Sequence, residues 1–309
     1  MEERQSWRLR FLADAREFLA VAGPRLAAAP VVSTVVATIA DRTISRQAAG
    51  VRPPEGTWWL VVEERGEIVG AGMRTATFEP RPPFLLPMPE GAARLLAEVL
   101  HERGETVRAV NGALPAVGAF ADETARRAGG RVSVAQHTRL HELGDLVSPR
   151  PVPGHLVPAT DHDVHLVRTW FEAFMGDADV QAGRARGASA HEAPDTDEIL
   201  RRIHSGTVWL WLDDGGRPVH LTAANPPSFG VARVGPVYTP PEQRGRGWAS
   251  AAVHEVSRLL RAGGAQVCLF TDQANPTSNR IYAALGYRPV VDMANLVIEV
   301  GRDVAGVSR

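Results

Sequence analysis

The segment VYTPPEQRGRGWAS, residues 237–250, decides how the rest of the chain is interpreted. It begins like the end of a strand, passes through a pair of prolines that interrupt regular structure, and continues as a helix. Gly245 and Gly247 let the backbone approach a ligand closely, and Arg244 and Arg246 add positive charge. Because the amides of a first helical turn and the helix dipole both favour negative charge, the segment predicts an anion site suited to a pyrophosphate.

Two familiar phosphate motifs do not fit this segment. It lacks the Gly-Lys-Ser/Thr ending of a Walker loop, and it lacks the third glycine of a dinucleotide-binding fingerprint. An isolated Gly-x-Gly is also common where a turn simply enters a helix and its arginines face water. The surrounding sequence therefore has to decide between a binding loop and a plain turn.

The elements around the segment predict an α/β domain with a mixed sheet. Before it, a hairpin with Gly215-Gly216 at its turn precedes the strand that ends at Tyr238, and after it helices and strands alternate. The strands expected from the pattern are residues 208–212, 218–223, 232–238, 266–271 and 289–300. The expected helices are residues 161–174, 196–204, 247–261 and 276–285.

The first half of the chain repeats this order of elements. Its expected strands are residues 58–62, 68–77, 107–110 and 131–140, and its expected helices are residues 90–103 and 116–128. The segment 148–154 contains three prolines and a glycine, which disfavour regular structure. With 309 residues, the chain also exceeds the usual length of one domain. We therefore expect two similar domains, residues 1–148 and 149–309.

A second motif follows the first along the chain. Residues 271–289 read TDQANPTSNRIYAALGYRP and contain the pattern Asn-x-x-Ser-x-x-x-Tyr-x-x-x-Gly-Tyr, from Asn275 to Tyr287. Together with the Arg-x-x-Gly-x-Ala run at residues 244–249, this motif resembles the GNAT superfamily of N-acetyltransferases. The resemblance covers roughly residues 208–300. It implies two GNAT-like α/β domains, each a mostly antiparallel sheet flanked by helices, of which the second binds acyl-CoA.

The resemblance also implies where an acyl-CoA co-substrate, acetyl-CoA above all, would bind. A splayed pair of strands would admit the pantetheine, with backbone groups of Val237 and Tyr238 facing it. Asn275 and Asn279 would contact the pantetheine or its surroundings. The residues around the pyrophosphate would be Arg244, Gly245, Arg246, Gly247, Trp248, Ala249 and Ser250.

Tyr282 would be the general acid of the reaction. When an amine attacks a thioester, the leaving thiolate needs a proton, and a phenol held near the sulfur can donate it. Tyr287 is expected to pack at the end of a helix. The general base is left open between His220, Glu242 and a water relay, and Arg233 is expected either to orient the substrate or to face solvent.

A metal site is not expected. His162 and His165 are spaced to share a helix face beside Asp161 and Asp163, but the acidic pair fits a helix N-terminus and no distant ligand set is evident. Cys268 stands in an apolar strand and is expected to be a small buried hydrophobe without a catalytic role.

Two groups of residues could serve the acceptor side of the site. Tryptophans at strand spacing could line an aromatic pocket, although core packing is their more common role: these are Trp58, Trp59, Trp209 and Trp211. The segment 177–195 is expected to be a mobile loop around residues 183–189. Its Asp177, Asp179 and Glu192 could attract a cationic amine, although solvated loop charge is the more common role.

The first half of the chain departs from the family pattern. Residues 87–93, PMPEGAA, contain no Arg-x-x-Gly where the duplicate should carry its anion loop, and Ala125 stands near the position of the tyrosine. We therefore expect that the first domain does not bind CoA productively. It would instead support the fold, complete the acceptor pocket or mediate pairing.

Charge and composition exclude other classes. Lys and Arg (34) nearly balance Asp and Glu (35), so the net charge of −1 provides no overall field for nucleic acid or an anionic membrane. No apolar run approaches the roughly 20 residues that span a bilayer, and the N-terminal region lacks the core of a signal peptide. A single cysteine suits a reducing compartment, so we expect a cytoplasmic protein.

The function expected from these features is N-acyl transfer. An acetyl or other short acyl group would pass from acetyl-CoA to an amine by direct attack in a ternary complex. The alternatives are a non-catalytic acyl-CoA-binding regulatory module and a partner-binding protein that has lost CoA; the retained Tyr282 favours catalysis. The acceptor would be a small-molecule amine or a protein amino group, and the sequence does not identify which. A homodimer is possible, but the sequence does not determine the oligomeric state.

Overall fold

The computed structural model describes residues 7–76, 79–181, 183–190 and 193–299. Its packing divides the chain into two compact units. Unit 1 contains the described parts of Met1–Ala28, Ile39–His137 and Asp292–Arg309, and unit 2 contains Ala29–Thr38 and the described parts of Thr138–Val291. Within the described residues, no helix combines the length and the apolar character needed to cross a bilayer.

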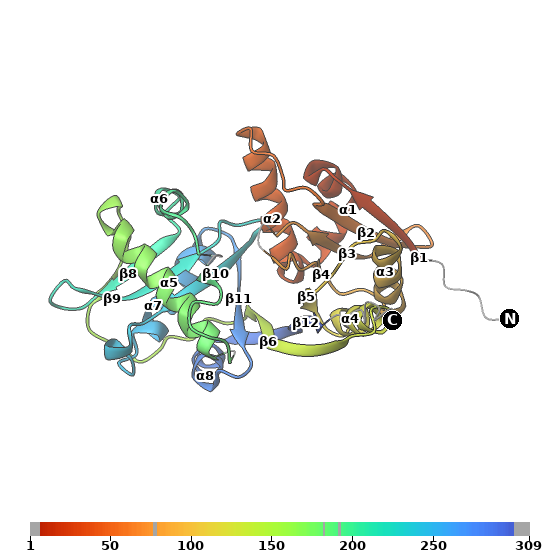
Figure 1. Cartoon of the computed structure of the whole chain (residues 1–309). Helices are drawn as coiled ribbons and strands as arrows, with labels where there is room; N and C mark the ends of the chain where they lie inside the picture. Colours follow the sequence, from red (N-terminus) through yellow and green to blue (C-terminus); the bar gives the residue numbers. More distant parts are fainter. Residues whose placement is uncertain (1–6, 77–78, 182, 191–192, 300–309) are drawn as a thin grey trace. The chain divides into compact units, whose positions relative to one another are not determined.

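Unit 1 is a mixed sheet with helices on both faces (Figure 1). Its strand order is β1-β2-β3-β4-β5-β12-β6, and only β4 and β5 within the first five strands run parallel. The strands are β1 (Trp7–Leu12), β2 (Trp58–Glu64), β3 (Glu67–Arg74), β4 (Phe84–Leu85), β5 (Ala109–Ala113), and parts of β6 (Arg131–Leu143) and β12 (Tyr287–Glu299). The helices are α1 (Ala15–Ala28), part of α2 (Pro30–Ala48), α3 (Glu90–Glu102) and α4 (Ala116–Arg127).

The alternation of β2 assigns the two faces of this sheet. Trp58, Leu60 and Val62 belong to the core that α3 and α4 cover. Trp59 points to the opposite face and stacks on Phe18 of α1, with ring centroids 5.0 Å apart. Both tryptophans of this strand are therefore core residues, as predicted.

Unit 2 contains the other part of the same 12-stranded sheet, with the strand order β12-β6-β11-β10-β9-β8-β7. The pair β10–β11 is parallel, and β6–β11, β9–β10, β8–β9 and β7–β8 are antiparallel. Besides β6 and β12, its strands are β7 (His155–Pro158), β8 (Val208–Leu212), β9 (Pro218–Ala224), β10 (Val231–Tyr238) and β11 (Gln266–Asp272). Its helical elements are η1 (Asp161–Asp163), α5 (Val164–Gln181), α6 (Thr196–His204), η3 (Pro241–Gln243), α7 (Trp248–Ala262) and α8 (Pro276–Ala284).

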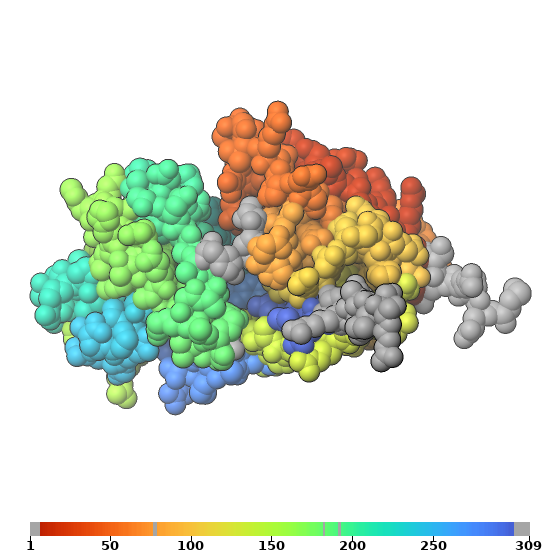
Figure 2. Space-filling model, viewed as in Figure 1, coloured from red at the N-terminus to blue at the C-terminus, as the bar shows by residue number. Residues whose placement is uncertain are grey.

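Alternating residues of β8 separate two cores in unit 2. Val208 and Leu210 pack with α5 and α6, which lie side by side on one surface of the unit (Figure 2). Trp209 and Trp211 face the other side of the sheet and belong to the clusters formed with α7. The pattern of apolar residues thus directs one helix layer to each face of the sheet.

Two strands pass from one unit to the other. β6 begins in unit 1, and its residues 138–142 pair with β11 in unit 2. β12 begins in unit 2, and its residues 293–297 pair with β5 in unit 1. Each sheet therefore contains a strand segment from the other half of the sequence. The division into domains 1–148 and 149–309 stays a prediction, because each compact unit of the structure combines segments from both halves of the sequence.

Most predicted elements are present with small shifts of their ends. α6 and β8 have the predicted bounds, and the predicted mixed, mostly antiparallel sheets flanked by helices are confirmed. The predicted strand 107–110 lies later in the chain, as β5, and α5 continues seven residues beyond the predicted end at Phe174. Residues 77 and 300, the predicted ends of two strands, lie outside the described residues.

The first strand and the first two helices were not predicted from the sequence. α2 has the sequence PVVSTVVATIADRTISRQA, in which β-branched residues prevail over good helix formers. Val31, Val36 and Ala40 are nonetheless buried, which shows that tertiary packing stabilises this helix. The short edge strand β7, HLVP, was missed because four residues carry little periodic signal.

The segment after α5 is tied to one buried carboxylate. Asp179 accepts hydrogen bonds from the backbone N–H groups of Gly187 and Ser189, and Ser189 Oγ and the Arg184 guanidinium also donate to it. Burial acts to raise the pKa of Asp179, but these donors outweigh it and hold the pKa at about 2. The prediction of solvated charge is wrong here, because Asp179 is fully buried. Glu192 lies outside the described residues.

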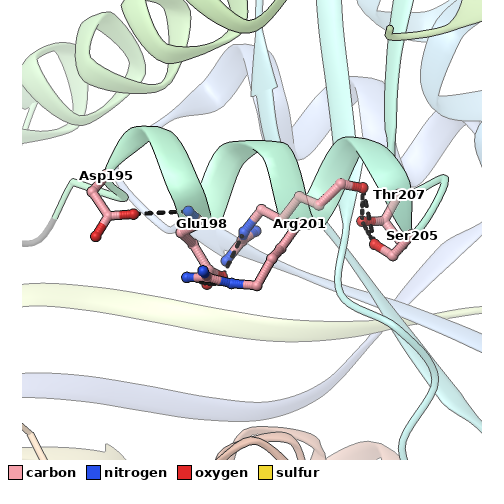
Figure 3. A network of polar contacts seen from close by, with 6 residues as sticks. Asp195, Glu198, Arg201, Ser205 and Thr207 are labelled. Carbon is pink, nitrogen blue, oxygen red and sulfur yellow. Dashed lines mark hydrogen bonds and ion pairs between the residues drawn. The ribbon is translucent and has the colours of Figure 1, made fainter. Parts of the chain in front are cut away.

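Helix α6, which follows this segment, is capped at both ends (Figure 3). Asp195 accepts a hydrogen bond from the backbone N–H of Glu198 at 2.7 Å. The Glu198 carboxylate pairs with Arg201 and Arg202, which outweigh the effect of burial and keep its pKa below the ordinary value. At the other end, Ser205 Oγ donates to the carbonyl of Arg202, where Thr207 Oγ1 donates as well.

We expect the substitution Asp195→Ala to lower the free energy of unfolding by about 1 kcal/mol, because the first turn of α6 loses its side-chain acceptor. Urea unfolding followed by circular dichroism would measure the change. Asp197→Ala is the matched control, since it removes the same charge from the same turn without removing the cap. Equal effects of the two substitutions would contradict a specific capping role for Asp195.

Candidate functional site

The two parallel strands of unit 2 separate before they end. β10 and β11 pair from Val231 and Gln266 as far as Val234 and Leu269, but β10 continues to Tyr238 and β11 to Asp272. The register of β10 against β9 shifts between Val234 and Val237, so β10 contains one extra residue there. Such a bulge bends a strand, and beyond it β10 and β11 form no further pairs; these unpaired strand ends are called the fork. The unpaired strand ends agree with the splayed strands that the resemblance implied, and entry of a pantetheine between them stays a prediction.

The predicted anion loop lies directly after the fork. β10 ends at Tyr238, η3 follows, and α7 begins at Trp248 with Gly247 as its N-cap residue. Gly247 has φ of 87°, and a Cβ at this position would lie 2.9 Å from Val152 Cγ1. The cap residue carries no side-chain acceptor, so the first amides of α7 have no partner in the helix or in its cap.

The two arginines of the loop are held differently. Arg244 donates from Nε to the carbonyl of Thr239 at 3.0 Å and pairs with Asp177 of α5 at 2.5 Å. Arg246 is exposed and contacts only the carbonyl of Glu242, at 3.4 Å, among the described residues. Arg244 is thus positioned by the protein, whereas Arg246 is free to move toward an anion.

Asp177 also binds a second arginine, Arg186, at 2.5 Å. Burial would raise the pKa of the Asp177 carboxyl, but the pairs with Arg186 and Arg244 outweigh it and keep the pKa below its ordinary value. The prediction that Asp177 is solvated loop charge is wrong, because α5 extends to Asp177 and its carboxylate pairs with Arg244 of the anion loop. A predicted helix that continued beyond Phe174 would have placed Asp177 on α5.

His220 is buried in a hydrogen-bond network beneath α7. Its Nδ1 lies 2.7 Å from Thr239 Oγ1, and its Nε2 lies 2.8 Å from Thr222 Oγ1. Burial lowers the pKa of His220 to about 3, so the imidazole is neutral, with one nitrogen donating and the other accepting. Because Thr239 also binds Arg244, the network connects a strand of the sheet to the anion loop.

This arrangement removes His220 from the candidates for the general base. A base must contact the attacking amine or a water beside it, but His220 has no exposed surface and both ring nitrogens are occupied. Glu242, the other candidate, is an exposed residue of η3. The structure therefore assigns His220 a positioning role.

Tyr282 and Tyr287 lie in one hydrophobic cluster but differ in their polar contacts. Tyr287 donates to Ser257 Oγ at 2.7 Å, since the Ser257 hydroxyl itself donates to the carbonyl of Val253. Tyr287 is therefore a packing residue, as expected. The Tyr282 hydroxyl has no hydrogen-bond partner among the described residues, and burial raises its pKa, so the phenol keeps its proton at neutral pH.

The two asparagines of the second motif hold the turn that begins α8. Asn275 is the N-cap residue of α8 and accepts from the backbone N–H of Ser278 at 3.0 Å. Asn279 Nδ2 donates to the carbonyls of Asp272 and Gln273, both at 3.2 Å. Both residues thus shape the end of β11 at the fork, and contact with a ligand stays a prediction for them.

The remaining predicted site residues contribute through the backbone. The Trp248 indole packs in a cluster with Trp211 and is buried, so only its amide faces the loop. Val237 and Tyr238 pair with β9 on one side and face the open fork on the other. The amides of Gly245, Ala249 and Ser250 complete the loop and the first turn of α7.

The other candidates from the sequence have structural roles. Asp163 forms a capping box with Thr160, as its position at a helix start indicated. Cys268 is buried, which raises its pKa to about 11. Arg233 donates to Thr34 Oγ1 at 3.3 Å. Within the described part of the chain, no group of three or more His, Cys, Asp or Glu residues is arranged to hold a metal ion.

In the described residues of unit 1, the corresponding parallel strands and helix start are tightly packed. Its parallel pair β4–β5 is in such close contact that a Cβ on Gly112 would lie 2.1 Å from the carbonyl oxygen of Leu85. At the start of α3, a Cβ on Gly91 would lie 2.3 Å from the Trp7 ring. The Leu85 backbone therefore occupies the space beside Gly112, and the Trp7 indole covers the start of α3.

Comparison with known proteins identifies the fold. A family model described as FR47-like protein matches residues 227–295, which include the fork, the loop, α7 and α8. A GCN5-related N-acetyltransferase from Sphaerobacter thermophilus has 16% sequence identity and a TM-score of 0.58, with 95% of this chain and 96% of that chain covered. A comparison with curated proteins finds no significant match.

Two further solved structures are similar over their whole length. A GNAT-family acetyltransferase from Colwellia psychrerythraea has 11% identity and a TM-score of 0.53, with 95% of this chain and 100% of that chain covered. A tandem GNAT protein from the clavulanic acid biosynthesis pathway has 14% identity and a TM-score of 0.52, with 95% and 99% covered. The chain thus has the GNAT acetyltransferase fold in two copies, as its motifs indicated.

The buried neutral His220 predicts a specific acid sensitivity. With a folded-state pKa of about 3, below the ordinary 6.5, the unfolded chain binds a proton that the folded chain does not, so stability falls as the pH drops from 6.5 toward 3. Between pH 7 and pH 5, wild-type protein should lose on the order of 2 kcal/mol relative to His220→Gln. Urea unfolding at both pH values measures this difference.

The matched control is His162→Gln, which changes an exposed histidine. Its pH dependence should follow that of the wild type. A His220→Gln profile parallel to the wild-type profile would show that His220 is not held neutral.

Proposed function

We propose that this protein is an acyl-CoA-dependent N-acyltransferase that uses unit 2. The observation that carries the proposal is the open fork between β10 and β11 followed directly by an N-terminal helical turn without a side-chain cap. A forked pair of strands accommodates an extended chain with amide groups, and a free helix N-terminus favours a phosphate. Acyl-CoA carries both chemical features in one molecule.

The residues present fit the phosphate end of such a co-substrate. The amides of the first turn of α7 would bind the pyrophosphate, and Arg246 would turn from the Glu242 carbonyl toward it. Arg244, held by Asp177 and Thr239, would add a fixed positive charge beside the amides. We infer acetyl-CoA or another short acyl-CoA as the donor.

Tyr282 would supply the proton that the reaction needs. In direct attack, the amine nitrogen bonds to the thioester carbon, the carbon–sulfur bond breaks, and the sulfur takes a proton from the phenol. The amine loses its own proton to water or to a base that is not yet assigned. The protonated phenol with an uncommitted hydroxyl supports this role for Tyr282.

Unit 1 would have a different role from unit 2. The contact at Gly112 and the indole of Trp7 at the start of α3 support the proposal that it does not bind CoA productively. We infer that the first domain, residues 1–148, supports the second, residues 149–309. The acceptor would be a small-molecule amine or a protein amino group, and the single cysteine suits a cytoplasmic protein.

We expect Arg246→Gln to weaken acetyl-CoA binding by about tenfold, because one charge-assisted hydrogen bond to the pyrophosphate is lost. Isothermal titration of both proteins with acetyl-CoA measures the change. Arg217→Gln removes the same charge from the β8–β9 hairpin, where Arg217 pairs with Asp213, and should bind like the wild type. Failure of the wild type to bind acetyl-CoA would exclude the proposed function.

We expect Tyr282→Phe to lower kcat by about a hundredfold or more with little change in acetyl-CoA affinity, since the variant removes the proton donor and keeps the ring. Release of free CoA thiol in the presence of an amine panel measures turnover. Tyr287→Phe is the matched control: it loses a hydrogen bond to Ser257 and should lose stability but not kcat.

Two other results would change the proposed mechanism or function. Full activity of Tyr282→Phe would remove Tyr282 from the mechanism. Binding of acetyl-CoA by the wild type without turnover on any amine would favour the alternative of a regulatory acyl-CoA-binding module.

A further inference from the structure

The carboxylate of Asp177 is shared by two arginines from different parts of unit 2. Its Oδ1 accepts a hydrogen bond from Arg186 Nη2, and its Oδ2 accepts one from Arg244 Nη2, each at 2.5 Å. Arg244 follows β10 in the anion loop, whereas Arg186 belongs to the segment 183–190 after α5. Because each carboxylate oxygen holds one arginine, Asp177 links the anion loop directly to this segment.

The position of Arg186 depends on how the segment 183–190 is folded. The buried carboxylate of Asp179 accepts hydrogen bonds from residues that flank Arg186 in the chain: Arg184, Gly187 and Ser189. The Arg186 side chain also lies across Gly176 of α5, where an added Cβ would be 3.0 Å from Arg186 Nη1. The folded segment therefore holds Arg186 at Asp177.

Arg244 has a donor group left for an anion. Its Nε donates to the carbonyl of Thr239 and its Nη2 donates to Asp177, whereas Nη1 has no hydrogen-bond partner among the described residues. About half of the Arg244 side chain is exposed. A phosphate group can therefore bind Arg244 without displacing Asp177.

A bound phosphate would change the balance of charge around Asp177. Without a ligand, two guanidinium groups surround this one carboxylate. A phosphate at Arg244 adds negative charge close to the carboxylate, so the attraction of Arg186 for this region becomes stronger. Since the folded segment 183–190 keeps Arg186 in place, phosphate binding and folding of the segment favour each other, and this linkage is reciprocal.

We propose that the ion pairs of Asp177 with Arg186 and Arg244, here called the Asp177 relay, couple acyl-CoA binding to the folding of the segment 183–190. A bound acyl-CoA then stabilises the folded segment. The proposal rests on the proposed function of unit 2. Asp177 and Arg186 are positioning residues in this relay, because they act through Arg244 and through the charge near the ligand.

Hydrogen–deuterium exchange followed by mass spectrometry tests the relay in the full chain. Saturating acetyl-CoA should slow exchange of the wild-type segment 183–190 about threefold, a size typical of exposed ion pairs. The amides of Gly187 and Ser189, which bond to Asp179, report this opening. In Asp177→Asn, acetyl-CoA should protect the first turn of α7 but no longer slow exchange in the segment.

The affinity for acetyl-CoA tests the reciprocal effect. Arg186→Gln should weaken binding about threefold in isothermal titration, and this loss should largely disappear in an Asp177→Asn background. Arg168→Gln is the matched control, because it removes the same charge from an ion pair within α5, with Glu172, and should bind like the wild type.

The outcomes separate the relay from the proposed function. If the wild type binds acetyl-CoA but exchange in the segment 183–190 does not change, the relay is overturned while the proposed function stands. Equal losses of affinity in Arg186→Gln and Arg168→Gln would also overturn the relay. If the wild type does not bind acetyl-CoA, both are overturned. If Asp177→Asn does not fold, wild-type exchange and the Arg186→Gln titration decide.

Discussion

The bulge in β10 is the constraint on which the candidate site depends. Sheets normally continue their hydrogen bonds to the strand ends, but the extra residue between Val234 and Val237 turns β10 away from β11. The unpaired stretch of both strands and the position of the anion loop both follow from this separation. A regular β10 would close the fork and leave no space for a ligand chain.

A line of polar contacts then places the anion loop relative to the sheet. His220 bonds to Thr239, the Thr239 carbonyl holds Arg244, and Arg244 pairs with Asp177 of α5. These contacts extend from the core under α7 to the helix on the opposite face of the sheet. Only the His220 end of this line is fully buried, and an unbonded imidazole there would be costly, whereas the contacts of Arg244 lie at the exposed end. The loop is thus positioned before any ligand binds.

The two units show how one fold can keep or lose such a site. Both sheets contain a parallel pair of strands followed by a helix, yet the pair in unit 1 is closed at Gly112 and its helix start is covered by Trp7. The exchange of segments by β6 and β12 completes each sheet with a strand from the other half of the sequence. The first half of the sequence therefore still contributes a strand segment to the sheet region that has the fork.

The sequence by itself determined the loop, its two glycines, the second motif and most elements, because these depend on local conformation and on periodicity along the chain. Tertiary structure alone decided the partner of Arg244, the burial of His220 and the position of Arg186 beside Asp177. It also decided that α2 is a helix despite its β-branched residues. These features arise from contacts between residues far apart in the chain, and a side chain's environment cannot be read from its neighbours in sequence.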